Sequence, residues 1–380
     1  MNAEPDMTPD APRPDSDDTL AADACPTGAD DTGATVPGET DAAAADAEPD
    51  DIDDAAETDA AETDADDAAA PVGLALSPAS VPAERQRAGF VALIGAPNAG
   101  KSTLVNALVG AKVSIVTHKV QTTRAIVRGI VMEGDAQIIL VDTPGIFAPR
   151  RRLDRAMVKT AWTHAYDADR VCLLIDAKRG ITEATEKILD ELTSVRQPKT
   201  LLLTKVDLVD PPTLLGLAEK ANEKTRFDET FMVSAQTGSG VPDLARHLAA
   251  SMPQGPWLYP EDQISDIPMR QLAAEITREQ LTLRLHDELP YSATVETETW
   301  KSLRNGSVRI EQAIFVERDG QKKIVLGEKG KTVRAISMSA RQEIAKLVGA
   351  PVHLFLFVKV RPRWTDDPER YRVMGLDFSR

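Results

Sequence analysis

The chain has 380 residues and a formal net charge of −16, and this charge is concentrated at one end. Residues 1–83 hold 23 Asp and Glu against a single basic residue, whereas the rest of the chain carries a net charge of +6. The length predicts two or three domains. Two cysteines exclude a disulfide scaffold and a cysteine metal cluster, and without a long apolar run a transmembrane helix is excluded. The acidic start is unlike a secretory signal, so we expect a cytosolic protein.

The first segment, residues 1–84, is built from Ala, Asp, Glu, Thr and Pro with few large apolar side chains. Such a composition cannot bury enough apolar surface to offset the entropy lost on ordering, so we expect a disordered acidic tail. It is either a solvated spacer or an interaction tail that competes with RNA for basic surface.

Residues 85–251 alternate short apolar runs with helix-like segments, which predicts an α/β domain. Because strands that are apolar on both faces need helices on each side, the sheet should be mostly parallel. A further strand over 124–132 is expected at an edge of the sheet. The predicted strands cover 90–94, 137–141, 170–175, 200–203 and 230–233, and the predicted helices cover 101–109, 153–165, 182–195, 213–225 and 242–250.

The proline-rich run MPQGPWLYP opens a linker that we place at 252–266. Residues 267–380 then form a predicted α+β domain large enough for its own core. The residues Phe315, Phe355 and Phe357 fall on its strands and are expected in that core. Its predicted helices cover 269–286, a short stretch near 321 and 332–347, and its predicted strands cover 293–303, 308–316 and 352–360.

The sequence GAPNAGKS fits the pattern G-x-x-x-x-G-K-[ST] and joins a predicted strand to a predicted helix. Glycines let backbone amides approach phosphate oxygens, and the helix N-terminus favours the same anion. Lys101 can contact the β and γ phosphates, and Ser102 can ligate Mg²⁺. This loop predicts a nucleoside triphosphate site formed by Gly95, Asn98, Ala99, Gly100, Lys101, Ser102 and Thr103.

Three short motifs follow at the ends of later strands. DTPG can place Asp142 near the metal ion and the Gly145 amide near the γ-phosphate, with Thr143 between them. The motifs TKVD and SAQ can read the base. A carboxylate at Asp207 accepts hydrogen bonds from the guanine N1 and 2-amino groups, a donor pair that adenine lacks, and so favours guanine. The remaining predicted base contacts come from Thr204, Lys205, Ser234 and Ala235.

Towards the C-terminal end, GEKG joins the predicted short and long helices, and basic residues surround it. Its glycines would let a sugar–phosphate backbone come close, as the loop of a KH domain does with about four nucleotides. Ile324, Val325 and Ile336 are candidates for an apolar floor under the bases, with ordinary core packing as the alternative. RNA contacts are predicted from Lys322, Lys323, Gly327, Glu328, Lys329, Gly330, Lys331 and Arg334.

Together these motifs resemble the Era family of ribosome-assembly GTPases over residues 87–380. The matching nucleotide motifs are GAPNAGKSTLVNALVG, KVQTTR, VDTPGI, TKVDLV and SAQTG, and the RNA-binding half is matched by VERDGQKKIVLGEKGKTVRAI. The resemblance implies an α/β P-loop G domain followed by an α+β type II KH domain. It also implies a Mg²⁺-dependent GTPase that binds the 3′ end of 16S ribosomal RNA and assists assembly of the 30S subunit, with GTP hydrolysis switching the RNA-binding state.

The resemblance assigns roles within these motifs. In QTTR it implies a switch threonine, and we favour Thr123 over Thr122. The expected Mg²⁺ ligands are Ser102, Thr123 and Asp142, and the expected catalytic residues are Lys101, Thr123 and Gly145.

One position departs from the family's usual pattern, and two others bear on hydrolysis and on a second cation. Thr204 stands where the family has Asn, and a hydroxyl makes fewer hydrogen bonds than an amide, so we expect slightly weaker guanine binding. Ile146 follows DTPG, where Ras-like enzymes place a water-orienting Gln, so we expect slow intrinsic hydrolysis. Asn98 is a candidate ligand for K⁺, or it merely suits a tight turn.

Two other functions stay open at this stage. The chain could be a GTP-dependent RNA-binding scaffold with negligible hydrolysis, or a membrane-associated signalling GTPase. We expect a monomeric cytoplasmic protein that binds GTP or GDP, and we leave peripheral contact at the inner membrane open. GTP would order QTTR and the segment after DTPG, and the linker would transmit the change to the RNA-binding domain.

Overall fold

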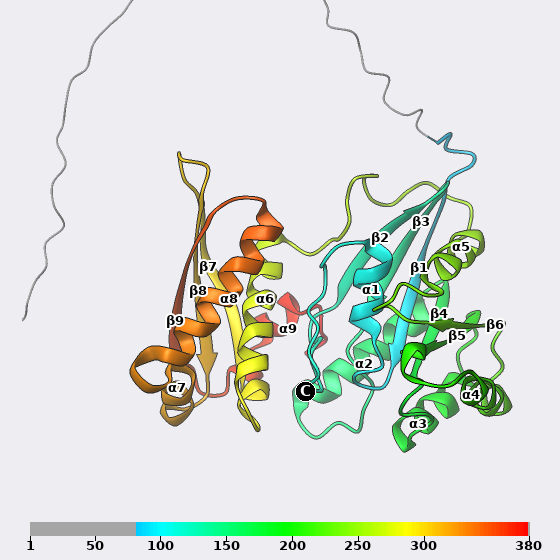
Figure 1. Cartoon of the computed structure of the whole chain (residues 1–380), viewed down its shortest axis with the longest axis horizontal. Coiled ribbons are helices and arrows are strands. Elements are labelled where there is room, and N and C mark those ends of the chain that lie inside the picture. Colours follow the sequence, from blue (N-terminus) through cyan, green and yellow to red (C-terminus); the bar gives the residue numbers. More distant parts are fainter. Residues whose placement is uncertain (1–80, 379–380) are drawn as a thin grey trace, which may run out of the picture. The chain divides into compact units, whose positions relative to one another are not determined.

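The computed structural model describes residues 81–378, so almost all of the predicted acidic tail lies outside the described residues. Within that range the chain forms a six-stranded sheet and a three-stranded sheet, each with its own helices (Figure 1). Both sheets belong to one compact unit of the chain. No helix between residues 81 and 378 is long and apolar enough to cross a membrane.

The six-stranded sheet confirms the predicted α/β architecture. Its strands run in the order β2-β3-β1-β4-β5-β6, and all pair in parallel except β2, which is antiparallel to β3 at one edge. The strands are β1 Arg87–Gly95, β2 Val127–Glu133, β3 Ala136–Asp142, β4 Arg170–Asp176, β5 Lys199–Thr204 and β6 Glu229–Val233. The helices are α1 Lys101–Val109, α2 Arg152–Asp167, α3 Glu183–Leu192, α4 Pro211–Lys224 and α5 Val241–Ser251.

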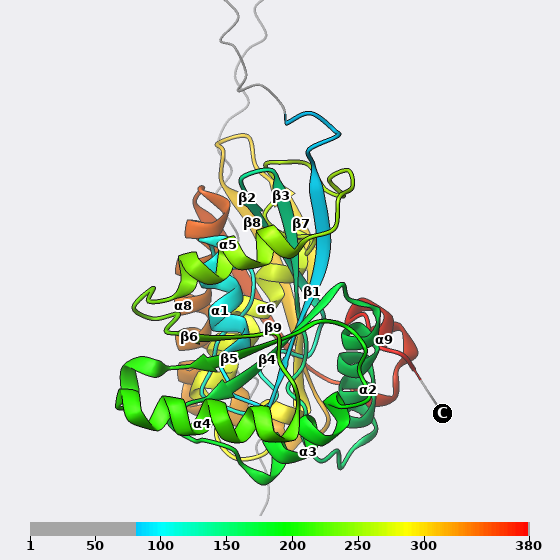
Figure 2. The same ribbon diagram turned by 90° about the vertical axis from the view of Figure 1, so that its right-hand side faces the viewer.

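Alternating strand residues fill two separate cores. Val91 and Leu93 of β1 pack in a cluster with α1 and α5, whereas Leu173 and Ile175 of β4 pack in a cluster with α2, α3 and α4. Figure 2 shows these two helix layers on either side of the sheet. Because both faces are covered, the strands need apolar residues at nearly every position, which is why their sequences are continuous apolar runs.

The edge strand begins later than predicted. The sequence suggested a strand over 124–132, but β2 starts at Val127, and Arg124 lies outside the sheet with a 3% exposed side chain. Its guanidinium donates to the carbonyls of Ala293 and Pro290 at 2.9 and 2.8 Å. These contacts with a distant part of the chain hold Arg124 outside the strand, so that β2 begins after it. No local sequence pattern predicts such contacts.

The three-stranded sheet forms the predicted α+β unit. Its strands run in the order β7-β8-β9, with β7 antiparallel and β9 parallel to β8. Helices α6 and α8 pack on one face through Leu272, Ile276, Ile336, Ala340 and Ile344. The elements are α6 Met269–Arg284, β7 Ala293–Ser302, β8 Val308–Val316, α7 Asp319–Leu326, α8 Lys331–Val348 and β9 Val352–Val360.

The other face of this sheet corrects one expectation. Phe355 and Phe357 are 42% and 46% exposed, so the prediction that they lie in the core is wrong. Alternate residues of β9 point away from the helices, and the side chains at these two positions therefore face outward. Phe315 on β8 is buried as predicted, and the guanidinium of Arg370 stacks over its ring at 4.5 Å.

Arg370 belongs to a C-terminal helix that the sequence analysis missed. This helix, α9, spans Pro368–Val373, and the carboxylate of Asp367 caps it by accepting from the Glu369 amide at 3.1 Å. Tyr371 packs in a cluster with Met157 of α2, so the chain end returns to the six-stranded sheet. Trp364 is 1% exposed and donates to the Ser292 carbonyl at 2.9 Å. The ring of Trp364 is therefore buried beside the residue that precedes β7.

The predicted linker, residues 252–266, is held closely along the six-stranded sheet. The side chain of Gln137 is fully buried, accepts from the amides of Leu258 and Tyr259 at 2.8 and 3.0 Å, and donates to the Tyr259 carbonyl at 2.8 Å. Arg128 pairs with Asp266 at 2.6 Å. A segment with the composition of a linker is therefore held by several contacts, of which the buried Gln137 side chain supplies three hydrogen bonds.

We predict that Gln137→Ala releases this segment. Three backbone groups lose their partner, so the free energy of unfolding should fall by about 1–3 kcal/mol. Limited proteolysis should cut faster between residues 255 and 262, and thermal unfolding should report the loss. The exposed Glu261→Ala serves as the matched control. Equal cleavage rates in the two variants would mean that Gln137 does not hold the linker.

Candidate functional site

The phosphate-binding loop lies between β1 and α1 at the carboxyl edge of the parallel strands. Lys101 begins α1, is 6% exposed, and donates to the carbonyls of Gly95 and Ala96 at 3.1 Å each. Burial lowers the pKa of its ammonium group to about 8, because few charges compensate it there. A phosphate oxygen at the helix N-terminus would supply the missing counter-charge.

A cluster of oxygen atoms lies beside this loop. The Ser102 hydroxyl is 2.7 Å from both the Thr123 hydroxyl and Oδ2 of Asp142, and Ser114 donates to the same Oδ2 at 2.7 Å. Asp142 is fully buried, and burial raises the pKa of its carboxyl group. Its Oδ1 has no hydrogen-bond partner among the described residues. Hydroxyl and carboxylate oxygens at this spacing suit Mg²⁺, which prefers oxygen ligands and retained waters.

The structure distinguishes the two candidate threonines. Thr123 is buried and faces Ser102, whereas the hydroxyl of Thr122 contacts the Thr117 hydroxyl at 2.7 Å and donates to the Lys119 carbonyl at 2.8 Å. The geometry therefore favours Thr123 as a metal ligand. Ser114 was missed by the sequence analysis, because a serine in an unpatterned loop carries no signal of its own.

A cavity of about 450 Å³ opens above the loop. One wall is formed by the loop residues and Gly145, and the opposite wall by residues between Ile115 and Thr123. We call residues 112–124 the switch segment. A β-carbon on Gly145 would come within 2.9 Å of the Pro97 backbone, so only glycine fits against the loop. The sequence analysis also missed Arg179, an exposed cation on the cavity wall.

Asn98 joins the loop to the switch segment. It adopts a left-handed backbone conformation with φ 65°, as the tight-turn reading expects, and its side-chain amide donates to the His118 carbonyl at 2.8 Å. The side-chain nitrogen is therefore already used, and only the side-chain oxygen is left for a cation such as K⁺.

Two residues around DTPG face the protein interior. Thr143 is fully buried and its hydroxyl donates to the Leu93 carbonyl at 2.7 Å, so its side chain is not on the cavity wall. Ile146 packs in the core cluster of α2 and α3, and its amide donates to the Gly95 carbonyl at 3.0 Å. An aliphatic side chain in this position cannot orient water, as the sequence indicated.

A second cavity, of about 250 Å³, adjoins the first and is lined by the predicted base-reading residues. Lys205, with φ 58°, donates to the Asn98 carbonyl at 2.8 Å and to Asp176 at 2.7 Å. Asp207 is exposed on this wall, so the bound base would itself have to exclude water from the carboxylate. The residues brought together here include Gly100, Thr103, Val116, Thr204, Lys205, Asp207, Ser234 and Ala235.

Thr204 replaces an expected Asn and still ties neighbouring loops. Its buried hydroxyl lies 2.7 Å from the Ala99 carbonyl and 3.2 Å from the Ile175 carbonyl. Asp176, which the sequence analysis did not select, ends β4 and holds Lys205. An acidic residue directly after an apolar strand was the only available signal for it.

The loop GEKG lies between α7 and α8, at the start of α8. Gly327 has φ 72°, and a β-carbon there would lie 2.1 Å from the Thr332 hydroxyl, whereas Gly330 has φ 75° and open space around it. Lys329 and Lys331 are exposed. Lys331 also lies 3.7 Å from the carboxylate of Glu328, so the loop combines a close approach for a backbone with exposed positive charges, one of which is paired within the loop.

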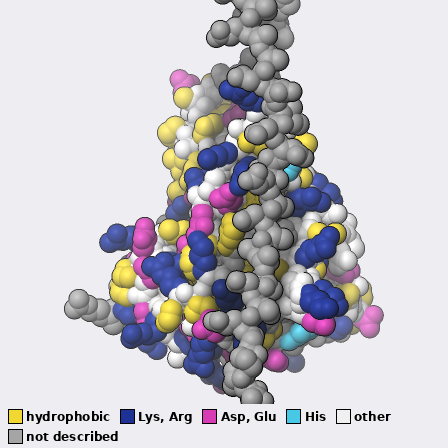
Figure 3. All heavy atoms as spheres, turned by 90° about the vertical axis from the view of Figure 1, so that its left-hand side faces the viewer, with side chains coloured by type: hydrophobic (Ala, Val, Ile, Leu, Met, Phe, Trp, Pro, Cys, Tyr) yellow, Lys and Arg dark blue, Asp and Glu magenta, His cyan; other side chains and the backbone are white. Residues whose placement is uncertain are grey.

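Of the two readings left open for the three apolar residues near this loop, core packing holds for two. Val325 and Ile336 are fully buried in the core cluster of the three-stranded sheet, whereas Ile324 is 60% exposed. At helical spacing, core packing decides the first two positions. On the face seen in Figure 3, Lys and Arg side chains are scattered among hydrophobic and acidic ones outside the part that grey atoms cover. This distribution of charge suits a local contact with RNA better than a broad basic surface that binds RNA by electrostatic attraction.

Two family models match the chain. Residues 90–205 match the model described as 50S ribosome-binding GTPase, and residues 288–365 match the KH domain model. The first covers the phosphate loop, the oxygen cluster around Asp142 and the start of the loop that carries TKVD. The second covers β7, β8, GEKG and β9.

Curated relatives and solved structures match over both parts. The chain is 69% identical over 296 residues to GTPase Era of Brucella suis, covering 78% of this chain and 95% of that protein. It is 69% identical over 290 residues to GTPase Era of Mesorhizobium japonicum, covering 76% and 94%. A crystal structure of Era with MgGDPNP and nucleotides 1506–1542 of 16S ribosomal RNA is similar at 36% identity and TM-score 0.72, covering 76% of this chain and 99% of that one. The crystal structure of a single-residue variant of Aquifex aeolicus Era bound to GDP.AlF4⁻ gives the same values.

We predict that Thr204→Val weakens nucleotide binding. Removing the hydroxyl leaves the Ala99 carbonyl of the phosphate loop without its partner, so affinity for a guanine nucleotide should fall about tenfold. The matched control is Thr200→Val on the same strand, whose hydroxyl accepts from Arg170 at 2.9 Å. Isothermal titration and thermal unfolding of both variants separate the effects. The idea is wrong if Thr200→Val lowers the affinity as much as Thr204→Val does.

Proposed function

Because the chain belongs to the GTPase Era family, we propose that it binds and hydrolyses GTP with Mg²⁺ and binds the 3′ end of 16S ribosomal RNA during assembly of the 30S subunit. The observation that carries this proposal is the presence, on one chain, of two adjoining cavities lined by the predicted phosphate and base motifs and of a GEKG loop with exposed lysines. Because both sites belong to one chain, a monomer suffices for this function. We propose that the monomer acts in the cytoplasm.

In the proposed GTP complex, Mg²⁺ would be held by Ser102 and Thr123, with Asp142 reached through water. The ion would neutralise charge on the β and γ phosphates. Lys101 would leave its two carbonyl partners for the same phosphates, and the Gly145 amide would orient the γ-phosphate. Ile146, which stands where Ras-like enzymes place a water-orienting Gln, packs in the core, so we propose slow intrinsic hydrolysis that a partner or a K⁺ ion beside Asn98 accelerates.

Base selection would come from the second cavity. Asp207 would accept from guanine N1 and the 2-amino group, Lys205 would lie along the base, and the Ala235 amide would meet O6. Adenine would leave the carboxylate unpaired once the base had excluded water, which costs more than the lost contact alone. Thr204 acts one step away, through the Ala99 carbonyl.

RNA would bind at the start of α8. Gly327 and Gly330 would admit the sugar–phosphate backbone, with charge from Lys329, Lys331 and Arg334. The proposed RNA follows the Era structure that holds nucleotides 1506–1542 of 16S ribosomal RNA. The proposed role in 30S assembly rests on the family resemblance alone, and the description of the matching G-domain model names the 50S ribosome instead. Two alternatives compete with this proposal: an RNA scaffold without hydrolysis, and a membrane-linked signalling GTPase.

We predict that the double variant Lys329→Glu and Lys331→Glu binds an RNA of the 16S 3′ end at least about tenfold more weakly than the wild type. The salt dependence of binding should also lose about one unit of slope per phosphate contact removed. Fluorescence anisotropy at several salt concentrations measures both. Charge reversal is preferable to changing Gly327, because any side chain there would strike Thr332 and distort the loop.

The control carries one charge reversal at a distance. Lys220→Glu lies on the exposed side of α4 and should leave RNA affinity unchanged. Both proteins should still hydrolyse GTP at the wild-type rate in the absence of RNA. Unchanged RNA affinity in the double variant would remove the GEKG loop from RNA binding. Wild-type protein that binds the RNA but shows no GTP hydrolysis above background would favour the scaffold.

A further inference from the structure

The switch segment is held from outside the six-stranded sheet. Helix α6, which belongs to the three-stranded unit, presents Arg278 and Glu279 to it, and their exposed fractions are 2% and 4%. Two adjacent charged side chains at such burial require partners, because an unpaired charge in this environment is costly. Neither residue belongs to the apolar core of the three-stranded unit. Their burial therefore depends on polar partners elsewhere.

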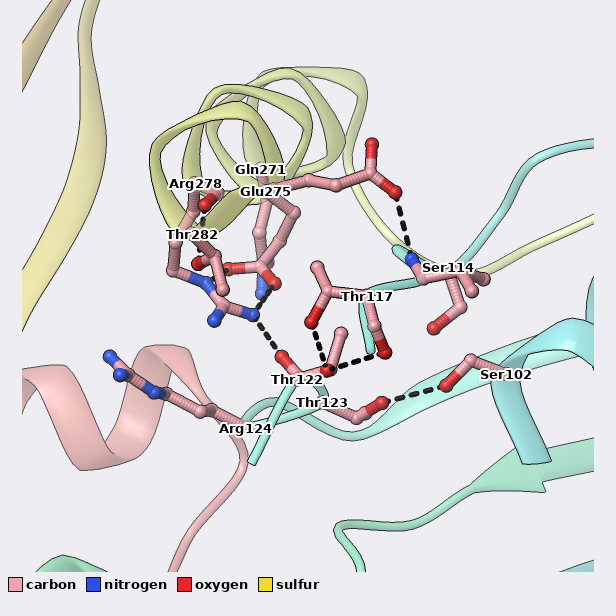
Figure 4. Close-up of polar contacts among 12 residues, drawn as sticks. Ser102, Ser114, Thr117, Thr122, Thr123, Arg124, Gln271, Glu275, Arg278 and Thr282 are labelled. Atoms are coloured by element: carbon pink, nitrogen blue, oxygen red, sulfur yellow. Dashed lines mark hydrogen bonds and ion pairs between the residues drawn. The ribbon is translucent and has the colours of Figure 1, made fainter. Parts of the chain in front are cut away.

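Those partners are backbone groups of the switch segment. Nη2 of Arg278 donates to the Thr122 carbonyl at 2.5 Å, and Oε1 of Glu279 accepts from the Val116 amide at 2.8 Å. Figure 4 shows Arg278 reaching from α6 to the Thr122 carbonyl, with Thr123 next along the chain and joined to Ser102 on its other side. Glu275 pairs with Arg278 on the same helix and fixes the direction of the guanidinium.

Contacts with the three-stranded unit hold the residues on either side of Thr123, which completes the oxygen cluster around Asp142. Thr122 is held by Arg278, and Arg124 is anchored to the carbonyls of Ala293 and Pro290. Thr123 lies between them, with its hydroxyl 2.7 Å from that of Ser102. Because both neighbours are fixed by the three-stranded unit, the position of Thr123 depends on where that unit lies.

The same helix continues toward the RNA loop. Lys112, at the start of the switch segment, contacts Glu279 of α6 and Glu343 of α8 at 2.5 Å each. Gln280 of α6 donates to Glu343 at 2.7 Å. Helix α8 begins directly after GEKG, so a rigid element joins this contact to the proposed RNA site.

We propose that Arg278 and Glu279 are positioning residues for the nucleotide site: through Thr122 and Val116 they hold the switch segment so that Thr123 meets Mg²⁺ and the γ-phosphate. The inference rests on the proposed GTPase function and adds a route for coupling to RNA. A triphosphate that orders the segment stabilises its contacts with α6, and RNA that orders α6 and α8 stabilises the segment. The two ligands therefore change each other's affinity by the same factor.

This route differs from the one expected at the linker. The segment 252–266 runs along β2 and β3, where Gln137 and Arg128 hold it, and its contacts lie away from the phosphate cavity. The contacts of α6, in contrast, reach the cavity wall itself. Coupling through α6 needs no change in the linker.

Arg278→Ala and Glu279→Ala test the proposal by their effect on nucleotide choice. Each should weaken binding of a non-hydrolysable GTP analogue with Mg²⁺ about tenfold, the effect of losing one hydrogen bond to a charged group. Binding of GDP should stay within about twofold of the wild type, because only the γ-phosphate and its Mg²⁺ need Thr123. In the same variants, RNA of the 16S 3′ end should bind the GTP-analogue and GDP forms equally.

Two further variants separate positioning from general stability. Glu279→Gln keeps an acceptor oxygen for the Val116 amide and should retain most of the preference for the GTP analogue that Glu279→Ala loses. Arg270→Ala is the matched control, since Arg270 lies on α6 and donates to the carbonyls of Thr297 and Glu298 within the three-stranded unit. It should leave the ratio of GTP-analogue to GDP affinity unchanged. If Arg278→Ala does not fold, the pair Glu279→Ala and Glu279→Gln still decides.

An unchanged affinity ratio in folded Arg278→Ala, or equal ratios in Glu279→Ala and Glu279→Gln, would overturn the positioning role and leave the GTPase proposal intact. Wild-type protein that binds neither nucleotide would instead defeat the proposed function itself.

Discussion

The switch segment, residues 112–124, has to fit two surfaces at once, and most of the functional geometry follows from that constraint. On one side Thr123 and Ser114 join Ser102 and Asp142 in a cluster with one carboxylate oxygen left unpartnered among the described residues. On the other side its backbone forms hydrogen bonds with the side chains of Arg278 and Glu279 of α6. A segment without helix or strand structure has few internal contacts of its own, so its conformation is set by these neighbours.

The parallel sheet supplies the rigid half of the arrangement. Strands β1, β3, β4 and β5 end at one edge, so the phosphate loop, DTPG, Asp176 and TKVD meet there although they are far apart in the chain. Buried apolar residues on both faces hold the strand ends in place. The buried ammonium of Lys101 and the buried carboxylate of Asp142 are costly in the free protein, and bound phosphate and metal would relieve that cost.

Much of this could be predicted from sequence, because glycine spacing and strand-end motifs are local patterns. The phosphate loop, Asp142, Asp207 and GEKG lie where those patterns indicated. Tertiary contacts have no such signature: Ser114, Arg278 and helix α9 were missed, and Arg124 was assigned to a strand. Burial decides between the two readings of Val325 and Ile336 in favour of core packing. It contradicts the expectation for Phe355 and Phe357, which face outward because β9 alternates across an open face.

Hydrogen–deuterium exchange of the full chain tests the central claim most directly, because it follows the switch segment and α6 in the same sample. The account predicts that a GTP analogue with Mg²⁺ slows amide exchange in residues 112–124 and in 269–284 together, and that GDP protects the phosphate loop with much less effect on either. Protection by the GTP analogue that stops at the phosphate loop, with α6 exchanging as in the nucleotide-free protein, would contradict it.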